Sequence, residues 1–393
     1  MEGMMKRITL LLVAVLAPAL LTTRLGSAEG KSPKANAAAT GEDLFAQPKV
    51  YRMKIELSDS ARDALRKEPR HYVKATIQEG SQVYQEVGVR LKGNTSFQTI
   101  DKKPALSIKF NEFARDHDFH GRSRVLLNNG LQDPTYLSEA IAGEIFRAAG
   151  VPAPKVTFAR VELNGRDLGL YVMAEAVNHD FLSHYFKKAK GNLYEGVNSD
   201  VGDKLEKDSG NGSDDQADLR ALASAAKEPD PTLRLKKLTP LLDIDRFLSF
   251  AAVEVMTWHN DGYSMDRNNY RIYHDPGSGQ MVFLPHDLDQ LFTKTDGPIL
   301  PEWKGLVAKA LLTPPTGQQL YLERMSKLLP TAFKVETLHA RLNEMAGVVR
   351  PALAERDPNA VKPFDAALAQ LRDRIAKRAT FIEQQLRALS GAK

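Results

Sequence analysis

The sequence predicts an α+β fold in which strands come first along the chain and helices dominate its second half. Short runs of alternating polar and apolar residues recur between residues 50 and 174. Apolar residues at helical spacing recur after residue 214, interrupted by one strand pair at 270–284. A strand-rich part followed by a helical part also favours a ligand-binding cleft between the two.

Composition narrows the classes of protein that need considering. The 393 residues are 42% hydrophobic and 26% charged, which is typical of globular proteins. No cysteine is present, and this excludes disulfides and thiolate metal sites. The net charge of +5 is spread along the chain without a basic stripe interleaved with aromatic residues, so we expect no nucleic-acid partner.

The N-terminus has the pattern of a secretory signal peptide. Lys6 and Arg7 precede an apolar run at 8–21, and small residues end the segment at Ala28. We therefore expect a signal peptide over 1–28 and an exported protein in the periplasm, at the cell surface or in the medium. An uncleaved N-terminal anchor is the alternative, and no further membrane segment is expected.

A flexible linker is expected over residues 29–48, which are rich in Ala, Gly, Lys, Ser and Thr. One domain then follows over residues 49–393. We place the boundary between its strand-rich N-lobe and its helical C-lobe near residues 176 and 177.

The expected N-lobe begins with a strand at 50–57, followed by a short helix through Leu65 that Ser58 or Ser60 caps. Strands at 71–77 and 83–91 form a hairpin around Gly80 and Ser81, and a further strand covers 106–110.

A helix is expected from Asp133 to Ala149, where Gly150 ends it. Strands at 156–163 and 168–174 then meet at Asn164-Gly165, a strong hairpin pattern.

The C-lobe is expected to begin with an exposed loop at 198–216, rich in Asp, Gly, Asn and Ser. Helices follow at 214–227 and 243–257, and a hairpin pairs 270–273 with 281–284 around a Pro-Gly-Ser-Gly turn. After residue 315 the pattern is helical, ending in an amphipathic stretch at 364–389.

Four side chains with hard oxygen atoms flank the second hairpin. Asp261 and Asn269 precede it, and Asp287 and Asp289 follow it. Because a hairpin returns the chain on itself, its two ends lie together, so these side chains are expected to converge. Such ligands suit Mg²⁺ or Ca²⁺ rather than zinc.

The order of these residues matches that of protein kinases, in which a base carboxylate and a metal-binding Asn precede two short strands and a metal-binding Asp. The local sequence differs from that of ordinary protein kinases, because their H-R-D-L and D-F-G motifs are both missing. Asn269 comes eight positions after Asp261, longer than the kinase spacing, so Asn268 is an alternative ligand.

Several ordered stretches resemble the CotH kinase family of bacterial and some fungal secreted proteins. The resemblance runs in order from about residue 50 to about residue 295, and the C-terminal helices fit more loosely. The stretches are 88–96, Lys103-Pro104 with 108–110, 126–129 with Asp133, 146–154, Asn164-Gly165 with 169–172 and Glu175, 191–194, Asn269-Tyr270 with Tyr273, and 285–289.

The resemblance implies an atypical protein-kinase-like fold with two lobes and a site for ATP. The segment from Arg90 to Ser96, with Gly93 and Asn94 inside it, would lie over the phosphates. Lys109 would contact the α- and β-phosphates.

One glutamate would pair with that lysine, and a second would lie by the nucleotide. Glu139 and Glu144, both on the predicted helix at 133–149, are open alternatives for the first role, and Glu175 would have the second. Asp261 would be the catalytic base. Asn269 and Asp287 would hold Mg²⁺ or Mn²⁺, with support from Asp289.

Two departures from the family pattern stand out. Ser138 replaces an arginine common at the helix start, and His286 replaces the tryptophan of a Pro-Trp-Asp motif. The first removes one charge contact that the family pattern would supply.

The resulting prediction is an exported kinase that phosphorylates Ser or Thr in extracytoplasmic or coat proteins. A non-catalytic coat scaffold or adhesin of the same fold is the first alternative. A metal-dependent hydrolase is the second, and it would use the set His259, Asp261, His286, Asp287 and Asp289.

Overall fold

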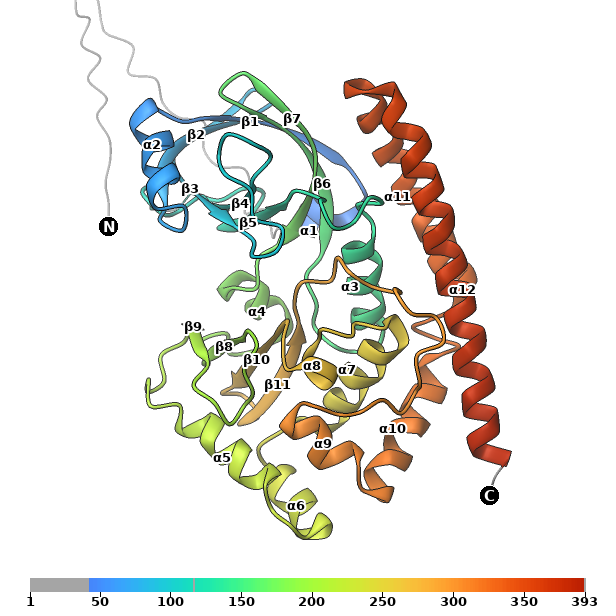
Figure 1. Cartoon of the computed structure of the whole chain (residues 1–393). Helices are drawn as coiled ribbons and strands as arrows, with labels where there is room; N and C mark the ends of the chain where they lie inside the picture. The colour runs from blue at the N-terminus through green and yellow to red at the C-terminus, as the bar shows by residue number, and fades with distance from the viewer. Residues whose placement is uncertain (1–41, 116, 392–393) are drawn as a thin grey trace, which may run out of the picture. The chain divides into compact units, whose positions relative to one another are not determined.

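The computed structural model describes residues 42–115 and 117–391 (Figure 1). The predicted signal peptide and the predicted linker up to residue 41 lie outside the described residues. The described residues belong to one compact unit, and its secondary structure is a mixture of strands and helices, as predicted.

Seven strands of the N-terminal half close into a barrel. The order is β1-β2-β3-β4-β5-β7-β6, with β1 and β6 pairing in parallel and every other pair antiparallel. The bounds are Val50–Glu56 for β1, Val73–Glu79 for β2, Gln82–Lys92 for β3, Ala105–Lys109 for β4, Arg124–Asn128 for β5, Val156–Leu163 for β6 and Arg166–Glu175 for β7.

Closure of this sheet was not predicted. Alternation shows which face of a strand is buried, but it carries no information about which strands pair at the two edges. Strand β5 was also not assigned, although its Val125 and Leu127 alternate with partly exposed neighbours.

The predicted linker ends too late. Helix α1 (Glu42–Ala46) lies inside it, and Leu44 and Phe45 are buried in the same apolar cluster as the barrel strands. Tyr51 also donates a hydrogen bond from its hydroxyl to the carbonyl oxygen of Leu44 at 3.3 Å. Residues 42–46 therefore belong to the folded domain.

Helix α2 (Asp59–Lys67) begins where predicted, because the Ser58 hydroxyl accepts a hydrogen bond from the amide of Ala61 at 3.2 Å. Helix α3 (Ser138–Ala148) begins five residues later than predicted. The reason is that the Asp133 carboxylate accepts from the amides of Thr135 (2.9 Å) and Ser138 (2.8 Å), which fixes a turn before the helix.

A second sheet of four strands has the order β11-β10-β8-β9. The predicted hairpin is confirmed as β10 (Tyr270–Asp275) and β11 (Gln280–Pro285). Strand β8 (Leu193–Gly196) joins it, and β9 (Glu206–Ser209) forms within the stretch predicted as loop.

The remaining elements are helical. Helix α7 lies buried in the largest apolar cluster and contacts α3, α10 and α12. Helix α12 contacts α7, α10 and α11 (Figure 1). No helix in residues 42–115 and 117–391 is long and apolar enough to cross a membrane. The bounds are His179–Tyr185 for α4, Ala217–Ala226 for α5, Pro231–Leu238 for α6, Ile244–Thr257 for α7, Tyr263–Asp266 for α8, Leu306–Leu312 for α9, Pro315–Leu328 for α10, Val335–Arg356 for α11, Pro358–Ala360 for the short 3₁₀ helix η1 and Val361–Gly391 for α12.

Candidate functional site

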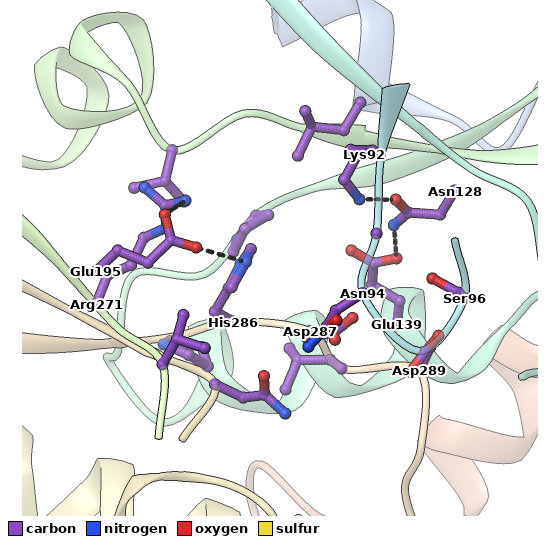
Figure 2. Close-up of a pocket in the computed structure, with 18 of the residues that line it drawn as sticks. Lys92, Asn94, Ser96, Asn128, Glu139, Glu195, Arg271, His286, Asp287 and Asp289 are labelled. Carbon is purple, nitrogen blue, oxygen red and sulfur yellow. Dashed lines mark hydrogen bonds and ion pairs between the residues drawn. The ribbon is translucent and has the colours of Figure 1, made fainter. Parts of the chain in front are cut away.

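A cavity of about 340 Å³ collects most of the predicted site residues. Its walls come from the barrel strands β3, β4 and β5, from α3, from the second sheet and from the segments around that sheet (Figure 2). The predicted residues that line it are Arg90, Gly93, Asn94, Ser96, Glu139, Glu175, Asp261, Asn269, Asp287 and Asp289.

Asp261 lies just beyond the C-terminal end of α7. The helix stops because Trp258 adopts a left-handed conformation (φ 50°), which turns the chain toward the cavity. One oxygen of the Asp261 carboxylate accepts a hydrogen bond from the side-chain amide of Asn269 at 2.8 Å. The other oxygen lies 3.4 Å from Nε2 of His259.

Two buried side chains support this turn from below. The Glu254 carboxylate accepts hydrogen bonds from the amides of Tyr263 (2.8 Å) and Ser264 (3.0 Å), and burial raises its pKa to about 8. The His259 ring is 1% exposed and lies 3.9 Å from Glu254, and burial lowers its pKa. The segment that carries Asp261 is therefore held by the core of the helical part.

Asp287 and Asp289 lie on the segment that follows β11. The amide of His286 donates to the carbonyl oxygen of Asn269 at 3.0 Å, which joins the two ends of the β10–β11 hairpin. Asp287 has a left-handed backbone (φ 54°), an uncommon conformation outside glycine that recurs at functional sites. The hairpin thus brings the four predicted residues to one cavity, as expected.

The chemistry of this end of the cavity fits a hard divalent cation. Burial, followed by the charges of Asp287 and Glu139, raises the pKa of Asp289 to about 8. A cation would offset this repulsion, and carboxylate and amide oxygens are the ligands that Mg²⁺ prefers. As the side chains stand, no three His, Asp or Glu groups in residues 42–115 and 117–391 surround a common point closely enough to form a metal site.

The geometry favours Asn269 over Asn268 as the ligand. Asn268 also lines the cavity, but its side-chain oxygen is occupied by a hydrogen bond from the amide of Asn198 at 3.1 Å. Asn269 instead contacts Asp261 directly.

The segment from Gly93 to Ser96 forms a tight turn at the mouth of the cavity. Gly93 has φ 93°, and a Cβ there would lie 2.8 Å from the Ser96 hydroxyl, so the turn requires glycine. The amide of Phe97 closes the turn on the carbonyl oxygen of Asn94 at 3.1 Å, and Asn129 holds the carbonyl oxygen of Ser96 at 3.0 Å.

The structure does not bring Lys109 to the cavity, which corrects the expectation for the lysine. Its ammonium group pairs with Glu112 at 2.6 Å, and its side chain is 39% exposed. Lys109 shares a strand face with Ser107, which does line the cavity, but it lies two residues further along β4. Lys92, at the end of β3, is the lysine in the cavity wall.

A polar chain joins Lys92 to helix α3. Lys92 donates a hydrogen bond to the side-chain oxygen of Asn128, and the Asn128 amide donates to Glu139 at 2.6 Å (Figure 2). Burial raises the pKa of Glu139 to about 7, while the charge of Lys92 opposes that rise. Of the two alternatives, Glu139 therefore lies with the cavity lysine.

Glu144 does not reach the cavity, so that alternative is corrected. Its carboxylate pairs with Arg341 of α11 at 2.6 Å. Five residues separate the two glutamates along α3, which places them on different faces of the helix.

Two further predicted residues, Glu175 and Arg90, also line the cavity. Glu175 is 2% exposed and pairs with Arg122 at 3.0 Å, while burial raises its pKa. Arg90 stacks on the Tyr72 ring at 5.0 Å. Both residues line the cavity, but neither is bound to the residues around Asp261 by a hydrogen bond or ion pair in the described part of the chain.

An ion network in the cavity wall was not found from the sequence. Arg271 pairs with Glu195 at 2.8 Å and with Asp208 at 2.6 Å, and Glu195 also lies 3.4 Å from Nε2 of His286 (Figure 2). These residues come from β8, β9 and β10, far apart in the chain, so no local pattern identifies them. Lys92 was detectable, since it directly precedes Gly93 in the stretch that carries the resemblance.

Comparison with known proteins gives the family. The family model described as CotH kinase protein matches residues 89–389. Inner spore coat protein H of Bacillus subtilis is 23% identical over 303 residues, which cover 70% of this chain and 82% of that protein. Invasin CotH2 of Rhizopus delemar is 27% identical over 192 residues, and the match spans 44% of this chain but only 32% of the invasin.

Solved structures give weaker similarity. The Helicobacter pylori proinflammatory kinase CtkA aligns with 73% of this chain and 95% of its own at 10% identity, with a TM-score of 0.35. The HipA–HipB–operator DNA complex of Shewanella oneidensis aligns with 75% of this chain and 68% of its own at 14% identity, with a TM-score of 0.31. TM-scores this low assign neither a fold nor a function. The family match, which covers most of the chain, is sufficient by itself: this protein belongs to the CotH kinase protein family.

Proposed function

We propose that this protein is an exported protein kinase that transfers the γ-phosphoryl group of ATP to a Ser or Thr hydroxyl of an extracytoplasmic protein. The observation that carries the proposal is the hydrogen bond between Asn269 and Asp261 in a cavity that Asp287 and Asp289 also line. Membership of the CotH kinase family supports the same reaction class.

The nucleotide would lie between the barrel and the helical part, which would serve as the two lobes of the proposed kinase-like fold. Lys92 and the turn at 93–96 border one stretch of the cavity and would contact the phosphates. Glu139 would orient Lys92 through Asn128. Glu175, which also lines the cavity, would lie near the adenine of the nucleotide.

Asp261 would accept the proton of the acceptor hydroxyl as its oxygen attacks the γ-phosphorus. The new O–P bond forms as the bond from phosphorus to the β–γ bridging oxygen breaks, and ADP leaves. Asn269 would hold the Asp261 carboxylate in place. Asn269, Asp287 and Asp289 would hold Mg²⁺ or Mn²⁺, whose charge stabilises the phosphoryl group during transfer.

Export and a coat or surface location are part of the proposal. The signal-peptide pattern at 1–28 supports export. The relatives include a spore coat protein and an invasin, whose names indicate coat and surface proteins. No membrane or nucleic-acid partner is proposed.

Transfer of labelled γ-phosphate from ATP, to the protein itself and to a generic acceptor protein, tests this function. Asp261→Ala and Asp287→Ala should abolish transfer, and Asp373→Ala on α12, where the carboxylate pairs with Lys377, should not. Absence of transfer and of Mg²⁺-ATP binding in the wild type would favour a scaffold or adhesin instead. Hydrolysis without nucleotide would favour the metal-dependent hydrolase.

A further inference from the structure

Arg378 is a fully buried cation on the C-terminal helix α12. Its residue exposure is 0%, and it is among the largest fully buried side chains of the described chain. None of the ion pairs found in residues 42–115 and 117–391 joins Arg378 to a carboxylate. A buried guanidinium without a carboxylate needs other acceptors, so its hydrogen bonds indicate what it does.

One hydrogen bond of Arg378 goes to the end of helix α7. Nη2 of Arg378 donates to the carbonyl oxygen of Val255 at 2.7 Å. Val255 lies in the last turn of α7, where its carbonyl oxygen accepts a tighter 3₁₀-type hydrogen bond from the amide of Trp258 at 3.2 Å and carries part of the negative end of the helix dipole. Arg378 therefore stabilises the helix end from which the chain turns to Asp261.

Two further hydrogen bonds of Arg378 go to the segment that follows Asp289. Nη1 of Arg378 donates to the carbonyl oxygen of Gly297, and at 3.4 Å to that of Thr295. The guanidinium also stacks on the ring of Trp258, 5.2 Å from its centroid. Gly297 packs so closely on that ring that a Cβ there would overlap it.

The two segments that Arg378 joins are the ones that carry the proposed base and metal ligands. Trp258 comes three residues before Asp261, and Thr295 comes six residues after Asp289. A backbone hydrogen bond from Phe292 to Thr257 at 2.7 Å links the same two segments. The guanidinium of Arg378 thus holds both segments against each other through its two terminal nitrogens.

We propose that Arg378 is a positioning residue for phosphoryl transfer, which sets the placement of Asp261 relative to Asp287 and Asp289 from outside the cavity. The proposal rests on the proposed kinase function. It assigns a role to helix α12, which otherwise packs on the helical part at a distance from the site. A lysine cannot replace the fork, because its single ammonium group does not reproduce the planar geometry of two donor nitrogens.

Amide hydrogen exchange of the full chain tests the joining of the segments without any assay of activity. Arg378→Lys retains the charge and most of the volume, and we expect exchange at residues 256–262 and 290–297 to accelerate by about tenfold or more. Exchange in barrel strands β1 to β7 should stay as in the wild type. Arg374→Lys, at an exposed position one turn away on α12, is the matched control and should change neither segment.

Kinetics test the effect on the reaction. Because a misplacement of about 1 Å can cost about 10²-fold, Arg378→Met should lower kcat by about that factor, and Arg378→Lys by less. The KM for ATP should stay within about twofold of the wild type, because Arg378 makes no contact with the bound nucleotide in this proposal. Arg374→Met should match the wild type in both parameters.

Three results would overturn the proposal. The first is unchanged hydrogen exchange in either segment of Arg378→Lys, and the second is equal acceleration of exchange across the whole domain. The third is a loss of activity in Arg378→Met that comes from a higher KM while kcat is preserved. If the wild type transfers no phosphate, the kinase function fails, and the exchange measurement still decides whether Arg378 holds the two segments together.

Discussion

The side-chain amide of Asn269 donates a hydrogen bond to the carboxylate of Asp261 over 2.8 Å. The two residues stand on either side of the short helix α8, at the end of α7 and the start of β10. An asparagine that uses its N–H₂ group in this way keeps its carbonyl oxygen for a cation. The pair therefore connects proton transfer and metal binding in the proposed reaction.

Replacement of Asn269 distinguishes the two candidate asparagines. Asn269→Ala should lower kcat for phosphate transfer by about 10²-fold, because it removes both the support for Asp261 and one oxygen ligand. Asn268→Ala should stay within about threefold of the wild type, since Asn268 bonds to Asn198 instead. Titration of kcat against Mg²⁺ concentration provides the measurement, and a greater loss in Asn268→Ala would reverse the assignment.

Replacement of Lys92 tests whether Lys92, and not Lys109, is the lysine that contacts the phosphates. Lys92→Met should reduce kcat/KM for ATP by about 10²-fold, because it removes the one ammonium group that lines the cavity among the described residues, and the hydrogen bond to Asn128 is lost with it. Lys109→Met is the control, and it should retain near wild-type transfer because Lys109 pairs with Glu112 outside the cavity. The opposite ranking of the two variants would restore Lys109 to the role that the sequence suggested.

The failure at Lys109 shows what a strand pattern can predict. The resemblance assigned Lys109 to the phosphates, and in the structure Lys109 shares one face of β4 with Ser107, which lines the cavity. How far along the strand the cavity extends depends on the neighbouring strands, and register is not contained in one strand's sequence. The choice between Glu139 and Glu144 depended in the same way on what α3 packs against.

The convergence of Asp261, Asn269, Asp287 and Asp289 was predictable because one local hairpin brings them together. The pairs Arg271–Glu195 and Arg271–Asp208 were not, since 76 and 63 residues separate their members. Closure of the barrel through parallel β1 and β6 is long-range in the same sense. Local chemistry was therefore accessible from the sequence, and long-range pairing was not.

The acidic end of the cavity predicts how stability changes with pH. Burial and neighbouring charge raise the pKa of Asp289 from 3.8 to about 8. The folded protein thus binds a proton that the unfolded chain releases, and the slope of stability against pH is negative between these two values. The stability that protonation of Asp289 contributes is fully present below the unfolded pKa. It is lost as the pH rises to the folded pKa of about 8.

Thermal unfolding with a chelator, measured across this range, should give a midpoint that falls as the pH rises. Asp289→Asn removes the titrating group and should flatten the dependence. Excess Mg²⁺ should raise the midpoint more at the upper end of the range, where the carboxylates are ionised and free to bind it. A midpoint equally insensitive to pH in both proteins would contradict the raised pKa.

Gly262, directly after Asp261, offers a test of the buried support. Its φ of −77° is open to any residue, so conformational freedom is not the reason for glycine here. A Cβ at this position would overlap the Glu254 carboxylate and lie 2.8 Å from Nδ1 of His259. Glu254 cannot yield easily, because it accepts from the amides of Tyr263 and Ser264.

Gly262→Ala should therefore lower the free energy of unfolding by about 1–3 kcal/mol, as overpacking does in cores. Transfer should fall as well, because relief of the overlap displaces the turn that carries Asp261. Gly347→Ala in α11 is the matched control: a Cβ there meets nothing within 4 Å, and it should raise stability by about 0.4–1 kcal/mol without changing transfer. Chemical denaturation and the phosphate-transfer assay measure both effects. A Gly262→Ala protein with normal stability but no transfer would mean that the glycine serves the substrate and not the core.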